Sequence, residues 1–154
     1  MNKTQTIEAQ CGATLIEVLI EVLILAIGLL GLAGMQMTSV QSNHSAYYRT
    51  QATVLAGDLA DRMRANRTAA LTTAYNTNFP TSTNTNAVTG TQAQKDLAEW
   101  LNSLANTLPE GTGKVEQSSN LVTIHVRWND NRGRIKASDD TTTPSETFIY
   151  RTEI

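Results

Sequence analysis

Cysteine, proline and aromatic residues are scarce in this chain of 154 residues. Cys11 is the only cysteine, so no disulfide can form within the chain. Aromatic residues make up 5 % of the sequence, and many of the hydrophobic residues, 40 % in all, lie in one aliphatic run near the N-terminus. The remaining part is rich in Thr, Asn, Ser and Ala, so we expect it to build only a modest core.

An excess of positive charge is also missing. Lys3 is the only one of the 12 basic residues that precedes Thr38. The acids before that point are Glu8, Glu17 and Glu21 out of 14, so the part from Thr38 onward is neutral. A domain that grips nucleic acid normally carries a clear positive excess. We therefore expect no general nucleic-acid binding.

Signatures of catalysis are absent from the sequence as well. No G-x-S-x-G motif, P-loop or dinucleotide fingerprint occurs. His125 lies in a predicted strand without a second histidine nearby, because His44 belongs to a predicted helix, and no cysteine is there to bind a metal. The sequence therefore predicts no enzyme, no catalytic residue, no metal site and no cofactor.

The chain does contain one long apolar segment, which runs from Ala13 to Met35 as ATLIEVLIEVLILAIGLLGLAGM. As a helix this segment is roughly 34 Å long, enough for a hydrocarbon core of about 30 Å. It is longer than the apolar stretch of a secretory signal peptide, and a poor cleavage site follows it. The segment predicts a membrane anchor that stays in the mature protein.

Two acids interrupt the start of this segment. Glu17 and Glu21 are four residues apart and share one face of a helix. A carboxylate at membrane depth costs on the order of 2–3 kcal/mol on insertion scales, and such a residue usually marks a function. For Glu21 we favour a position near the headgroups or a protonated form, whereas the sequence around Glu17 indicates a function.

Glu17 ends the stretch Gly12-Ala13-Thr14-Leu15-Ile16-Glu17, which follows the short polar leader MNKTQTIEAQCG. This stretch resembles the type III signal of type IV prepilins: a glycine, a small or aromatic residue, a hydroxyl residue, two aliphatics and a glutamate. The following run LILAIGLLGLAGMQ and the later pattern LPxGxGxV … VTIxVxW look more particularly like the PilV family of minor pilins, the type IV pilus modification proteins.

The resemblance implies specific processing. A prepilin peptidase in the membrane would cut between Gly12 and Ala13 and methylate the new amine of Ala13. That amine would give Glu17 a counter-charge, in its own helix or on a neighbouring subunit, and so support assembly. Two residues depart from the common pattern. Cys11 stands where pilin leaders often carry Lys or Arg, and Ala13 stands where major pilins usually have Phe, which favours a minor subunit.

The resemblance also implies a location and partners. The protein would sit in the inner membrane as a single-pass protein, with a cytoplasmic N-terminus and a periplasmic head, and would later join the cell-surface pilus. Its partners would be other minor and major pilins, the prepilin peptidase and the inner-membrane assembly platform.

Three glycines, Gly28, Gly31 and Gly34, recur in the anchor. Each costs up to about 1 kcal/mol in a helix relative to Ala. Two interpretations stay open: these are candidate positions where the helix melts in a filament, as in major pilins, or they allow close packing with neighbouring helices.

The predicted fold class is α+β and pilin-like, with a long N-terminal helix, membrane-spanning in its first half, packed against a small antiparallel sheet. The predicted parts are a leader (1–12), a transmembrane or filament-core helix (13–37), an amphipathic continuation of the helix (38–70) and a globular head (71–154). Five apolar residues of the continuation are expected to pack on the sheet: Val40, Tyr47, Leu55, Leu59 and Met63.

In the head we expect a surface loop over Thr72–Thr91, a second helix over Ala93–Leu108 and strands over Leu121–Trp128 and Phe148–Ile154, with an earlier strand beginning near Lys114. Alternation places four residues on one sheet face: Val122, Ile124, Val126 and Trp128. A local basic patch contains Arg127, Arg132, Arg134 and Lys136. For this patch a salt-bridged surface is favoured over an acidic partner.

The sequence thus predicts a minor type IV pilin that supports pilus assembly and, through it, twitching motility, adhesion or DNA uptake. Two alternatives stay open. One is a minor pseudopilin of a type II secretion system, which shares the leader, the anchor and Glu17. The other is a pilus-tip receptor-binding subunit, in which the loop Thr72–Thr91 or the basic patch holds a ligand.

Overall fold

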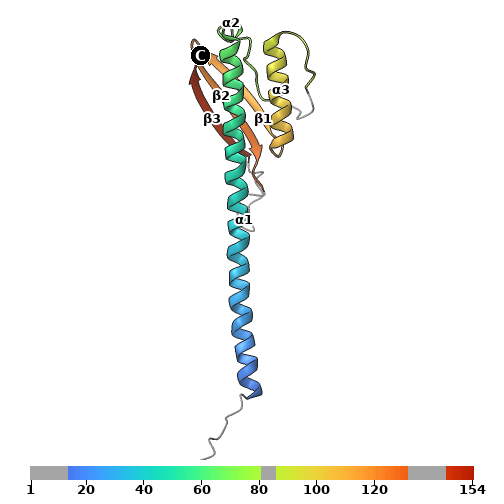
Figure 1. Ribbon diagram of the computed structural model, residues 1–154, viewed down its shortest axis with the longest axis vertical. Helices are drawn as coiled ribbons and strands as arrows, with labels where there is room; N and C mark the ends of the chain where they lie inside the picture. The colour runs from blue at the N-terminus through green and yellow to red at the C-terminus, as the bar shows by residue number, and fades with distance from the viewer. Residues whose placement is uncertain (1–13, 81–85, 132–144) are drawn as a thin grey trace, which may run out of the picture. The chain divides into compact units, whose positions relative to one another are not determined.

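The computed structural model describes residues 14–80, 86–131 and 145–154 (Figure 1). Its helices are α1 (Leu15–Ala65), α2 (Arg67–Ala70) and α3 (Gln92–Thr107), and its strands are β1 (Thr112–Ser118), β2 (Leu121–Asn129) and β3 (Ser145–Glu153). The predicted α+β class, with a long N-terminal helix and a small antiparallel sheet, is confirmed. The chain divides into two units, Met1–Ser39 and Val40–Ile154, and α1 contributes residues to both.

α1 is a single α-helix of 51 residues. Its length is possible because the first proline in the sequence is Pro80, so no residue of this stretch lacks the amide hydrogen that the helix needs. The helix ends at Ala65, after which Asn66 adopts φ −114° and ψ 48° and the short α2 begins. The stretch 38–70, predicted as one continuation of the helix, therefore consists of the end of α1 followed by α2.

The sheet lies in the unit Val40–Ile154 and has the antiparallel strand order β1-β2-β3. Burial alternates along β2, so that every second side chain points into the core. The buried residues are the four that the sequence pattern places on one face: Val122, Ile124, Val126 and Trp128. On β3, Phe148 and Tyr150 are paired with Val126 and Ile124, and they pack against the same core. The predicted strands are confirmed, with small shifts at their ends.

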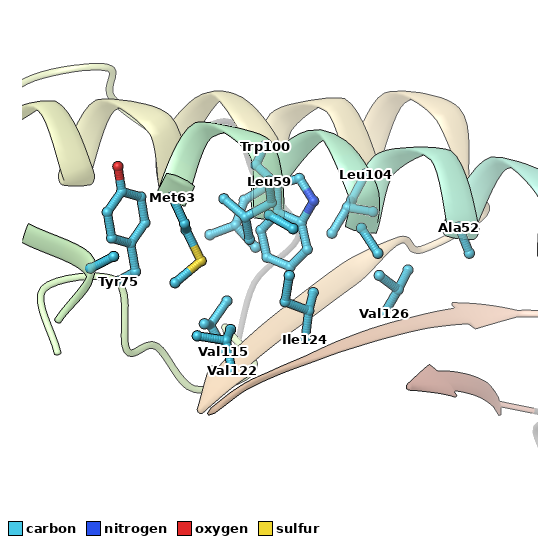
Figure 2. Packing of buried hydrophobic residues seen from close by; sticks show 14 of the residues in the cluster. Ala52, Leu59, Met63, Tyr75, Trp100, Leu104, Val115, Val122, Ile124 and Val126 are labelled. Atoms are coloured by element: carbon cyan, nitrogen blue, oxygen red, sulfur yellow. The ribbon is translucent and has the colours of Figure 1, made fainter. Parts of the chain in front are cut away.

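Within this unit, the second half of α1 packs on the sheet through small side chains. The buried stripe of α1 consists of Tyr48, Ala52, Ala56, Leu59, Ala60 and Met63. Figure 2 shows Leu59 and Met63 directed towards the strands that carry Val115, Val122 and Ile124. The three alanines are fully buried, so a longer side chain at these positions would have to displace its neighbours in the core.

The expected packing stripe was wrong at its first two positions. Val40 is 55 % exposed and Tyr47 is 54 % exposed, whereas Leu59 and Met63 are fully buried and Leu55 is half-buried. The prediction considered only large apolar side chains and so followed the wrong helical face before Leu55. The alanines of the real stripe carry little hydrophobic signal in the sequence, although they lie on the buried face.

α3 begins with a capping box formed by Thr91 and Gln94. The amide of Gln94 donates to the Thr91 hydroxyl (3.4 Å), and the Gln94 side chain accepts from the Thr91 amide (2.9 Å). The buried face of the helix includes Trp100, Leu101 and Leu104, in agreement with the predicted second helix.

The turn from α3 to β1 explains the pattern LPxGxGxV in physical terms. A Cβ atom added at Gly111 would lie 2.1 Å from the main-chain oxygen of Leu104. A Cβ atom at Gly113 would lie 2.2 Å from the Trp100 ring. Both positions exclude a side chain because β1 starts directly against α3.

The segment Thr72–Thr91 is only partly the surface loop that we expected, because Tyr75 near its start belongs to the core. Tyr75 is fully buried. Thr77 pairs with Val115 at the free edge of β1, with both N···O distances at 3.1 Å. The composition of this segment suggested solvent exposure, but one large aromatic side chain fixes it to the head. Residues 81–85 lie outside the described residues.

Candidate membrane anchor and assembly segment

The first turn of α1 holds Glu17 against the residue that precedes the helix. The Thr14 amide donates to the Glu17 carboxylate (N···Oε2 3.4 Å), and the Glu17 amide donates to the Thr14 hydroxyl (N···Oγ1 3.4 Å). This reciprocal pair has the pattern of a capping box: it gives the Thr14 amide a partner and adds to the bond that the Glu17 amide already makes with the Thr14 carbonyl (3.0 Å). The carboxylate therefore lies at the start of the helix, next to the predicted processing site. Gly12 and Ala13 themselves lie outside the described residues.

The apolar part of α1 has no cover within the described chain. By length and composition the helix can cross a membrane: its most apolar window has a mean hydropathy of 2.6, and none of that window is buried. The core helix of a soluble protein would instead be mostly buried. The large side chains from Leu15 to Met37 are exposed, for example Leu30 at 73 %. This surface needs an apolar environment that the described residues do not supply, such as lipid or other subunits.

The three glycines of the anchor lie in unbroken α-helix. A Cβ atom at Gly28, Gly31 or Gly34 would meet no atom within 4 Å, so no close packing inside the described chain requires a glycine there. Local melting would occur in the filament, and close packing would involve the helix of a neighbouring subunit. Both interpretations therefore remain predictions about the assembled state.

A buried polar network in the head was not predicted from the sequence. The Tyr75 hydroxyl donates to the Asp96 carboxylate (2.5 Å) and accepts from the Asn66 side-chain amide (3.1 Å). Asp96 also accepts from Gln92 (2.8 Å). Burial, together with the bond to Asp96, raises the pKa of Tyr75 to about 12. The network connects the end of α1, the following loop and α3.

Arg62 extends this network at the surface. It pairs with Asp58 (3.0 Å), as the (i, i+4) spacing predicts, and also with Glu99 of α3 (2.6 Å) and with Asp96 (3.8 Å). The hydrogen bond to Glu99 is the main reason why the pKa of Arg62 is raised. One signal could have revealed the network: Asp96 lies in the apolar stripe of α3, one turn before Trp100, where a carboxylate needs a buried partner.

The outer face of the sheet is occupied by charged and aromatic pairs. Glu116 contacts Lys114 (2.7 Å) and His125 (3.1 Å), and the hydrogen bond from Lys114 is the largest cause of its lowered pKa. Arg127 lies over the Phe79 ring, 4.2 Å from its centroid. Of the predicted basic patch only Arg127 lies in the described part, since Arg132, Arg134 and Lys136 fall outside it. The described residues contain no group of three metal-binding side chains.

Comparison with known families adds a separate observation. Residues 34–100 match the family model Tt1218-like, which is described as type IV pilin Tt1218. The match supports the assignment of this chain to the type IV pilins. It covers less than half of the chain and does not extend to the PilV family in particular. No curated protein and no solved structure matches the chain.

The matched region is almost separate from the residues that carry the resemblance in the sequence. The pilin match begins at Gly34, near the end of the anchor, and ends at Trp100 in α3. The prepilin-like signal ends at Glu17, and the apolar run ends at Gln36. Two different parts of the chain therefore point to a pilin. Type IV pilins are structural proteins, which supports the expectation that the chain is not an enzyme.

Proposed function

We propose that this chain is a minor type IV pilin that supports assembly of the pilus, and thereby twitching motility, adhesion or DNA uptake. The observation that carries the proposal is the arrangement of α1. One helix contains an exposed apolar segment, with Glu17 in its first turn, and its later part lies in the region 34–100 that matches a pilin model. An apolar helix of this kind suits both storage in a membrane and packing in the core of a filament.

Processing would change the charge at the start of α1. Hydrolysis of the bond between Gly12 and Ala13 would free the amine of Ala13, which is a cation at neutral pH and lies directly before Thr14. The peptidase would methylate this amine in a separate step, and the methylated amine would still be a cation. The capping box supports this role for Glu17, because it directs the carboxylate towards the main chain at that end of the helix. An unpaired carboxylate in an apolar filament core is costly, whereas a carboxylate paired with an amine offsets much of that cost. The paired state thus favours docking of the subunit.

This chemistry suggests an order of membrane storage, processing and assembly. The subunit waits in the inner membrane with its N-terminus in the cytoplasm and its head in the periplasm. It is processed by the prepilin peptidase and then joins other minor and major pilins through the assembly platform. The exposed apolar surface of α1 supports this part of the proposal, since it needs lipid before assembly and protein afterwards.

The test is to purify sheared pili and analyse their proteins by mass spectrometry. The expected result is a peptide of this chain that begins at N-methylated Ala13. Chains that still begin at Met1 would contradict the processing step, and absence from pili that contain other minor pilins would contradict the pilus assignment. A pseudopilin of type II secretion would carry the same modified Ala13 in the membrane fraction but would be missing from sheared pili.

A further inference from the structure

A groove on the head part of α1 is lined by Val40, Asn43, His44, Tyr47 and Tyr48. These positions follow the spacing i, i+3, i+4, i+7, i+8, so they share one helical face. Val40 and Tyr47 are 55 % and 54 % exposed, whereas Tyr48 is buried and belongs also to the core. The Tyr48 ring lies 5.9 Å from that of Tyr47 and 6.4 Å from that of His44, between ring centroids. The groove is therefore an open, mainly aromatic surface.

The chemistry of this stretch differs from that of the helix after it. Between Ser39 and Gly57, Arg49 is the only Lys, Arg, Asp or Glu, whereas charged residues recur from Asp58 to Arg67. A helix face that meets only water normally carries charged side chains. Side chains with an apolar body and a polar end, such as those of Tyr and His, are instead typical of the boundary between lipid and water.

The position of Glu21 indicates where that boundary falls on α1. A charged carboxylate is most stable at or outside the inner edge of the hydrocarbon core. A core of about 30 Å takes about 20 helical residues. Counted from Val22, the core therefore ends near Gln41, and a headgroup layer of roughly 5–7 Å covers about one further turn. Because helical side chains lean towards the N-terminus, Tyr47 reaches back towards this layer.

We infer that the groove of Val40, Asn43, His44, Tyr47 and Tyr48 begins at the outer edge of the hydrocarbon core, where Val40 lies, extends through the outer headgroup layer and contacts phospholipid while the subunit is held in the membrane. The inference rests on the membrane anchoring in the proposed function, and it names lipid as the partner of this surface. Glu17 lies among the inner headgroups and stays hydrated until the subunit leaves the membrane.

Site-directed spin labelling of the full chain tests this inference. In a Cys11→Ser background, single variants Tyr47→Cys, Val54→Cys and Leu25→Cys are labelled with a nitroxide. Each is placed at low density in vesicles of phosphatidylethanolamine and phosphatidylglycerol. Collision with a water-soluble nickel chelate and with oxygen is then measured by electron paramagnetic resonance. Val54 is the matched control, because it is 60 % exposed and lies seven residues after Tyr47 on the same helical face. Leu25 reports on the anchor itself.

The expected result is loss of nickel collisions at position 25, a reduced collision rate at position 47 and full accessibility at position 54. If position 25 is protected while positions 47 and 54 are equally accessible, the lipid contact is wrong and the anchor stands. If positions 47 and 54 are protected alike, another protein helix covers this face and the inference also fails. If position 25 is accessible to nickel, the proposed membrane anchoring itself is contradicted.

Discussion

The indole nitrogen of Trp100 donates a hydrogen bond to the main-chain carbonyl of Leu55 at 3.0 Å, and so joins α3 to α1. The same indole ring lies against Gly113 at the start of β1, where a Cβ atom could not fit. Trp100 is fully buried. One side chain therefore connects the helix that carries the anchor with the helix and the sheet of the head.

Replacement of Trp100 by Phe should destabilise the head by about 1–3 kcal/mol, because it removes the bond to Leu55 and leaves unfilled volume. Urea unfolding of the full chain in detergent measures the loss. Trp128→Phe is the matched control: Trp128 is also buried, but its indole nitrogen has no hydrogen-bond partner among the described residues. We expect a smaller loss for Trp128→Phe, and equal losses would argue against a specific contribution from the Leu55 bond.

Gly113→Ala should destabilise the head by about 1–3 kcal/mol, since the new methyl group would overlap the Trp100 ring and force a shift in a packed core. Gly57→Ala on α1 is the control, because its Cβ atom would meet nothing within 4 Å. At Gly57 the change should stabilise the helix by up to about 1 kcal/mol. Thermal unfolding of both variants should show opposite signs, and a neutral Gly113→Ala would refute the close approach.

Stability should fall at alkaline pH through Tyr75. Its pKa is raised from 10.0 to about 12 in the folded protein, so its contribution is fully present below pH 10 and is lost as the pH rises towards 12. The shift corresponds to a loss of about 2–3 kcal/mol over this window. The measurement is the unfolding free energy as a function of pH for the wild type and for Tyr75→Phe. The difference between them should shrink above pH 10, and a constant difference would contradict the raised pKa.

Glu17→Val should block entry into pili while leaving the subunit in the membrane, because the new amine of Ala13 would lack its carboxylate partner in the apolar core. The control is Glu21→Val, which removes a carboxylate one helical turn later. We expect Glu21→Val subunits to appear in sheared pili and Glu17→Val subunits to be absent, as measured by quantitative mass spectrometry. Equal recovery of both variants would overturn the proposed role of Glu17.

Local pattern was sufficient where a single element decides the outcome. The alternation of β2 correctly placed Val122, Ile124 and Val126 in the core. The long apolar run before Met37 correctly predicted a long N-terminal helix. In each case the spacing along one strand or helix already fixes which side chains are neighbours.

Local pattern was misleading where contacts come from distant parts of the chain. Tyr75 lies in a stretch whose composition indicates a surface loop, but its hydroxyl meets Asp96 of α3 in the core. Ala52 and Ala56 carry little hydrophobic signal, although they form the contact face of α1. Burial at these positions depends on the distance between helices and strands. The spacing of residues within one helix or strand does not reveal that distance.

The sequence by itself determined the apolar anchor, the acid at its start and the order of helices and strands, because each depends on residues close together in the chain. The tertiary structure decided which face of α1 is buried, why Gly111 and Gly113 have no side chain, and which partners Asp96 has. These depend on how closely α1, α3 and the sheet approach one another. That distance is set by the volume of side chains that meet only after folding.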